Sequence, residues 1–205
     1  MYNILCPRGR NGEIMNIKKF FSNYSYHCVK IFVDQIAIAV FGLALAITTA
    51  KANSTNDPNQ IQPMTVAVSV GAVIFFLVMA GQIAFRCGVE DREKISLGRF
   101  PKNNYTGFLM GIIANIPNLV LAVVYAVFRL FEATGGIAAF ANLAMKLIYG
   151  EYLGILSIPI SGTKLGMMPL SFFLITLPSI IACGIAYYLA VNGIIEFRPT
   201  KDKLE

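Results

Sequence analysis

Four long runs of apolar residues, separated by shorter polar segments, dominate this 205-residue chain. The runs cover residues 30–50, 64–85, 105–130 and 169–195. A helix rises about 1.5 Å per residue, so about 20 residues cross the roughly 30 Å hydrocarbon core of a bilayer. Backbone groups in lipid must find partners within the protein, and the runs lack the alternating pattern of a membrane β-barrel. The sequence therefore predicts an all-α integral membrane protein with a bundle of four transmembrane helices.

The composition agrees with this class. Hydrophobic residues make up 56% of the chain and charged residues 14%, whereas a soluble domain carries about 25% charged residues. In a soluble protein the formal net charge of +6 would raise the question of nucleic acid. Here the basic residues lie between the apolar runs, as membrane topology requires. We therefore expect the lipid bilayer, and no nucleic acid, as a partner.

The basic residues also predict the orientation. Thirteen Lys and Arg residues flank the runs on one side of the membrane and four on the other. Segments rich in Lys and Arg stay in the cytoplasm, which predicts a multi-pass protein of the cell membrane with both termini cytoplasmic. Residues 1–29 form a basic leader, with an interfacial helix and a disordered segment as equal alternatives. Residues 30–195 form the transmembrane domain, and residues 196–205 form a cytoplasmic tail.

Three interpretations stay open for the segment 136–160. A fifth span is disfavoured, because the segment carries Lys146 and Glu151 near its centre and a fifth crossing would place the basic tail outside. Polar or small residues recur every four positions, at Asn142, Lys146 and Gly150. This stripe favours an amphipathic helix at the outer surface. A re-entrant segment is the alternative, because Pro159 and the glycines after it break the chain before the fourth run.

Small and polar residues follow one helix face in three of the runs, at steps of three and four positions. Examples are Gln35 and Gly42 in the first run, Gly111 in the third and Cys183 in the fourth. Lipid gives helices little hydrophobic reason to associate, so small residues matter because they allow close packing. The three seams predict a tight bundle.

The third run contains the most informative stretch, Asn115-Ile116-Pro117-Asn118. Pro117 removes one backbone hydrogen bond and falls near the bilayer midplane, and the fourth run carries Pro178 at a similar depth. Two interrupted helices at one depth are the arrangement by which transporters build substrate or ion sites. The candidate residues of such an intramembrane site are Asn115, Pro117, Asn118, Thr176, Pro178 and Ser179.

A structural role competes with this hypothesis. Proline kinks and interhelical hydrogen bonds, worth about 0.6 kcal/mol each, are ordinary in membrane bundles. Inverted repeats, the stronger sign of a carrier, are not visible in the sequence. The sequence alone favours the structural role.

Asp34 is the acidic residue inside the first run. An intramembrane carboxylate is by default a candidate for a functional site. The competing explanation, which we favour from the sequence, is an ion pair with Lys30 one turn earlier on the same helix face.

Signals of catalysis are missing from the sequence. His27 is the only histidine, which excludes an HExxH zinc motif, and neither a GxxxxGK[ST] loop nor a GxSxG elbow occurs. The acidic residues Glu90, Asp91 and Glu93 alternate with basic ones and predict a solvated loop. We expect no enzyme activity and no catalytic, cofactor-binding or metal-binding residues.

Two functional hypotheses follow. The leading one is a non-enzymatic subunit or accessory partner of a larger membrane assembly, with another membrane protein or further copies of the chain as the partner. Its motives are the small extramembrane fraction and the small-residue seams. The alternative is a small transporter or channel that uses the interrupted helices around Pro117 and Pro178.

Overall fold

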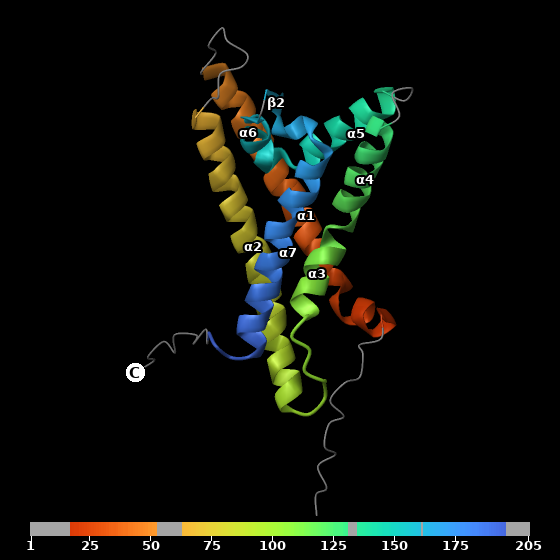
Figure 1. Ribbon diagram of the computed structural model, residues 1–205. Helices are drawn as coiled ribbons and strands as arrows, with labels where there is room; N and C mark the ends of the chain where they lie inside the picture. Colours follow the sequence, from red (N-terminus) through yellow and green to blue (C-terminus); the bar gives the residue numbers. More distant parts are fainter. Residues whose placement is uncertain (1–16, 53–62, 131–134, 161, 196–205) are drawn as a thin grey trace, which may run out of the picture.

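Three long helices run the length of the structure. The computed structural model describes residues 17–52, 63–130, 135–160 and 162–195 and is mostly helical (85%). α2 (Pro63–Ser96) packs against both α1 (Ile17–Ala52) and α7 (Pro169–Val191) (Figure 1). Each is long and apolar enough to cross a membrane. These helices confirm the helical class and indicate a membrane protein.

The third apolar run forms a broken helix. Its halves, α3 (Thr106–Ala114) and α4 (Ile116–Leu130), meet at Asn115 with a bend of 52°. The N–H of Asn115 is shared between two carbonyl oxygens at 3.2 and 3.1 Å, and Pro117 has no N–H with which to continue the ladder. If the pair is one broken span, the described residues contain four candidate spans instead of three.

The first two helices extend beyond the predicted spans. α1 begins at Ile17, within the predicted leader, because Phe20, Tyr24 and Cys28 recur every four residues and are buried against the other helices. α2 continues past residue 85 to Ser96. The predictions for residues 1–16 and 196–205 concern parts of the chain outside the described residues.

The segment between α4 and α7 turns back into the bundle. It consists of α5 (Gly135–Ile148), the 3₁₀ turn η2 (Gly150–Tyr152) and α6 (Leu153–Leu156). Figure 1 shows α5 leading from the far end of α4 inwards to α1. A short hairpin then leads to α7, with β1 (Pro159–Ile160) antiparallel to β2 (Thr163–Lys164), followed by the 3₁₀ turn η3 (Leu165–Met167).

Glycines show how deeply this segment enters. A Cβ atom added to Gly42 of α1 would lie 2.7 Å from the Cα atom of Glu151. Gly150 and Gly154 likewise contact the backbones of α1 and α2, at Ala39 and Thr65, too closely for any side chain. η2 and α6 are therefore wedged between α1 and α2. The expected helix on the outer surface is therefore not confirmed for the second half of the segment, where Gly150 and Gly154 allow its backbone to meet α1 and α2.

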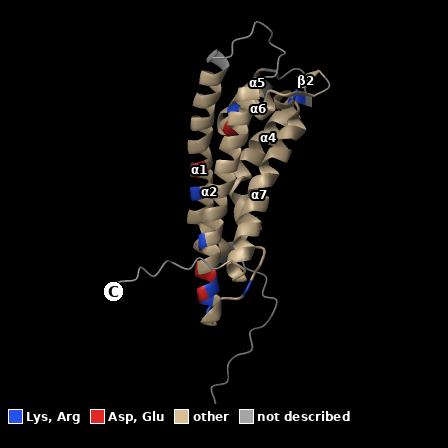
Figure 2. Ribbon diagram, turned by 90° about the vertical axis from the view of Figure 1, so that its left-hand side faces the viewer, with Lys and Arg blue, Asp and Glu red and all other residues tan. Residues whose placement is uncertain are grey.

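The interior of the bundle is filled by two clusters of apolar side chains. One lies between α1, α2, α3 and α7 and includes Phe76 and Met110. The other joins α4, α5, η2 and α7 around Tyr125 and Phe172. Large apolar side chains also cover the outward faces of the long helices, and charged residues gather at the C-terminal end of α2 (Figure 2). An apolar exterior with charge at its end suits a lipid environment.

Candidate functional site

A chain of hydrogen-bonded polar side chains crosses the bundle at the break in the third apolar run. The amide nitrogen of Asn115 donates to the Ser179 hydroxyl at 3.0 Å and to a carbonyl of its own helix at 2.8 Å. The amide nitrogen of Asn118 donates to Asn115 Oδ1 at 3.0 Å and to Gln35 Oε1 at 2.8 Å. All four side chains are buried. The chain therefore links α1, the broken helix and α7 through their interior faces.

Sequence and local structure explain why these groups meet. Asn115 and Asn118 lie one turn apart, so their side chains share a helix face. That face is the predicted seam, and Gly111 brings it so close to α7 that a Cβ there would lie 2.8 Å from the Cα atom of Ile180. The missing side chain of a glycine thus lets two amides reach a neighbouring helix.

Glu151 of η2 adds a carboxyl group to this polar interior. Its side chain is fully buried (0% exposed). The Gln35 amide neighbours both the Glu151 carboxyl and the Tyr149 hydroxyl, and the Asn118 amide also neighbours that hydroxyl. None of these contacts reaches hydrogen-bond geometry. We call the group formed by Gln35, Asn115, Asn118, Tyr149 and Glu151 the interior polar cluster.

Several atoms of the interior polar cluster have no partner within the described part of the chain. They are both carboxyl oxygens of Glu151, the Tyr149 hydroxyl, Gln35 Nε2 and Asn118 Oδ1. Buried polar groups are normally hydrogen-bonded, and a buried carboxylate without a compensating partner costs several kcal/mol. The cluster therefore keeps unused hydrogen-bonding capacity at these atoms, which include both oxygens of its carboxyl group.

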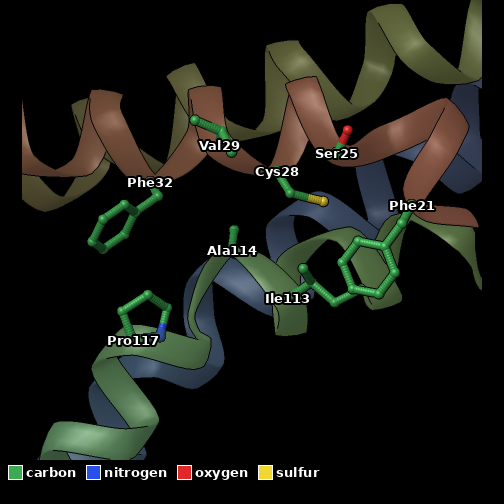
Figure 3. A pocket seen from close by; sticks show the side chains of 8 residues that line it. All are labelled: Phe21, Ser25, Cys28, Val29, Phe32, Ile113, Ala114 and Pro117. Carbon is green, nitrogen blue, oxygen red and sulfur yellow. The ribbon is translucent and has the colours of Figure 1, made fainter.

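Pro117 faces away from the interior polar cluster. Figure 3 shows its ring at a separate hollow of about 150 Å³ between α1 and the helix break, lined also by Cys28, Phe32 and Ala114. Nearly all of the lining is apolar. The role of Pro117 in the site is therefore to interrupt the backbone, while the polar contacts come from its neighbours Asn115 and Asn118.

The predicted site residues of the fourth span differ in their contacts. Ser179 joins the chain of hydrogen bonds through Asn115, whereas the Thr176 hydroxyl is buried and donates to a carbonyl of its own helix at 2.6 Å. α7 continues through Pro178 without a break. The expected interruption of this span is therefore not found, because one missing N–H can be tolerated within a packed helix.

Asp34 lies apart from the cluster. It is half-buried, and its Oδ2 atom has no hydrogen-bond partner among the residues that the structure describes. The expected ion pair with Lys30 is not found there either. The neighbouring Gln35, one position further along α1, is the residue that points into the bundle.

Glu151, Gln35 and Tyr149 were not among the predicted site residues. Glu151 did carry a signal, because it is a charged residue within an apolar segment, but the sequence pattern could not show that this segment enters the bundle. Gln35 lies on the small-residue seam of the first span, which was the sign that it faces other helices.

A second buried carboxylate lies at the C-terminal end of α2. Asp91 is 1% exposed and accepts hydrogen bonds from the hydroxyls of Tyr24 at 2.6 Å and Tyr187 at 2.9 Å. Lys94 lies 3.5 Å from its other oxygen. The prediction that Asp91 belongs to a solvated loop is wrong, because α2 continues here and turns this residue towards α1 and α7.

The fold and the site define a mostly helical protein with three candidate membrane-spanning helices and a buried polar cluster at a helix break. Comparison with protein families, with curated proteins and with solved structures found no match for the chain.

Proposed function

We propose that the chain is a four-span membrane protein with both termini in the cytoplasm. α1, α2, the broken pair α3–α4 and α7 are the spans, and the segment from α5 to α6 enters from the outer side as a re-entrant element. The thirteen-to-four division of basic residues supports this orientation. The wedging of Gly150 and Gly154 between α1 and α2 supports re-entry, since non-helical backbone at membrane depth must be buried in protein.

Within this topology we propose a non-enzymatic transporter or channel for a small polar solute or ion. The observation that carries the proposal is the unpartnered carboxyl group of Glu151, whose neighbour Gln35 is hydrogen-bonded to Asn118 next to the helix break. Broken helices near the membrane midplane supply free backbone ends and polar side chains to substrate sites. Intramembrane carboxylates typically mark ion or proton pathways.

The small-residue seams motivated the hypothesis of a partner protein. In the structure, glycines of these seams contact other elements of the same chain. Gly107 and Gly111 contact α7, and Gly42 contacts η2, all too closely to admit a Cβ atom. A subunit of a larger assembly stays the second candidate, favoured by the short connections between helices in the described ranges. Affinity capture from native membranes that recovered a stoichiometric membrane partner would favour this candidate over the transporter.

Cysteine accessibility tests the pathway. In a background without the four native cysteines, Asn118→Cys and Ser179→Cys should react with a membrane-impermeant maleimide from at least one side. Lys102→Cys, in the exposed turn after α2, is the positive control, and Val123→Cys, on the exposed apolar face of α4, reports labelling through lipid. If Lys102→Cys reacts while both interior positions stay unlabelled from either side, water does not reach the cluster and the proposal fails.

A further inference from the structure

We propose that the interior polar cluster is a binding site for one monovalent alkali cation, with the Glu151 carboxylate as its charged ligand. This inference rests on the proposed function, which it deepens by naming the class of solute. It starts from the balance of charge in the cluster. Glu151 is fully buried, and neither an ion pair nor a hydrogen bond to its side chain occurs among the residues that the structure describes.

No basic side chain of the inserted segment is placed to neutralise this carboxylate. Lys146, one turn before η2, lines a separate hollow of about 220 Å³ together with Lys164 and Ser157. A water molecule could satisfy hydrogen bonds but would leave the negative charge uncompensated. A buried carboxyl group that lacks an opposite charge either binds a proton or requires a cation. The cation is the component that we assign to the cluster, and the carbodiimide measurement described below distinguishes it from a proton.

The number of charges limits the cation to one positive unit. Glu151 is the only acidic residue of the interior polar cluster, and no group of three or more His, Cys, Asp or Glu residues that could hold a metal occurs in the described ranges. A divalent ion would keep an uncompensated charge in this apolar interior. Carbonyl oxygens can replace the hydration shell of an alkali ion, and Asn118 Oδ1 offers such an oxygen without a partner among the described residues.

Close packing limits the size of the ligand. Glu151 Cα lies within 2.7 Å of a Cβ position on Gly42, and Gly150 meets the backbone of Ala39 even more closely. These contacts clamp η2 against α1 and argue against an organic cation, in favour of a single ion held directly by the side chains.

The primary test measures binding of radioactive ²²Na⁺ to the purified full-length protein in detergent micelles, with choline chloride holding the ionic strength constant. The wild type should bind Na⁺ saturably, and Glu151→Gln should weaken the affinity about 100-fold or more, as expected for loss of a buried charge partner. Glu93→Gln, which removes an exposed carboxylate on α2, is the matched control and should bind like the wild type. Binding that Glu151→Gln leaves intact would overturn the assignment.

A second measurement needs no variant and therefore holds even if Glu151→Gln does not fold. Dicyclohexylcarbodiimide reacts with carboxyl groups in apolar surroundings, and peptide mass spectrometry can locate the adduct. Glu151 should be modified in choline buffer and protected by Na⁺. Protection by raised pH alone, with no effect of Na⁺ or K⁺, would mean that the site takes only a proton and would overturn the proposal.

Failure of this inference and failure of the proposed function give separate results. Labelling at Asn118→Cys without any cation binding would leave a pathway with another solute and reject the cation. Cation binding without labelling from either side would establish a fixed ion in a closed bundle, so that the ligand assignment stands and the transporter fails.

Discussion

Gly150 lies where the inserted segment approaches α1 most closely, and a single added methyl group there tests the arrangement. Its φ angle lies outside the left-handed region, so the local backbone accommodates alanine. The new Cβ atom would overlap the carbonyl oxygen of Ala39 and lie 2.8 Å from its carbonyl carbon, whereas ordinary contact begins at 3.4 Å. Because the obstacle is helix backbone, no side-chain rotation relieves it, and η2 must move away from α1.

The cost of Gly150→Ala follows from this geometry. Overpacking typically destabilises a protein by about 1–3 kcal/mol, and a rigid backbone obstacle places this variant near the upper end, at about 3 kcal/mol. A shift of roughly 1 Å would also separate Glu151 from Gln35, which weakens any ligand held between them, since small displacements of a site have large effects.

The assay compares Gly150→Ala with Gly71→Ala. The chain has no tryptophan, so unfolding in mixed micelles with increasing sodium dodecyl sulfate is followed by far-ultraviolet circular dichroism. Gly71 has nothing within 4 Å of an added Cβ atom, and alanine in a helix interior should be neutral or stabilise by about 0.5–1 kcal/mol. If Gly150→Ala unfolds at the same midpoint as the wild type, the segment is not wedged against α1 and the re-entrant element is refuted.

Two further predictions concern the other end of the bundle and the helix break. Tyr187→Phe removes one of two hydroxyl donors to buried Asp91 and should destabilise the protein by about 1.5–3 kcal/mol, while the exposed neighbour variant Tyr188→Phe should leave the thermal midpoint unchanged. Equal midpoints for both variants would show that the Asp91 contacts contribute nothing. Pro117→Ala returns an N–H to the helix and should keep or raise stability while lowering Na⁺ affinity at least about tenfold, since a straighter helix moves Asn118 away from Gln35. Unchanged Na⁺ affinity in this variant would show that the helix bend is not needed for the binding site.

The sequence predicted the elements whose signals are local. Long apolar runs predicted the three candidate spans directly. The spacing of Asn115 and Asn118 predicted that both amides share one packed face, and both are buried, whereas the contact with Ser179 depends on how the helices pack. Proline alone was a weaker signal, because Pro117 coincides with a broken helix whereas Pro178 lies within a continuous one. The difference comes from the surrounding packing, which sequence spacing does not contain.

The contacts that the sequence missed are long-range. Nothing near Glu151 shows that η2 packs against Ala39 of α1, since that approach depends on glycines on both elements. Asp91 was missed for another reason. Its charged neighbours suggested solvent, yet Ala84, Cys87 and Asp91 follow at steps of three and four and are all buried. If the predicted second helix had been extended past residue 85, its periodicity would have predicted Asp91 on the interior face of α2.

The two buried carboxylates, Asp91 and Glu151, differ in whether the chain itself supplies partners for them. Asp91 receives two tyrosine hydroxyls and lies near a lysine, so its charge is compensated by the chain itself and it joins α1, α2 and α7. Glu151 is buried to the same degree but has neither kind of partner in the described part of the molecule. The chain supplies hydrogen-bond donors for Asp91 from its own side chains. The lack of such donors at Glu151 therefore has no structural explanation in the described residues. The free energy lost at Glu151 is accounted for if a cation supplies the missing charge, and this is why the ligand site is assigned to Glu151 and the structural role to Asp91.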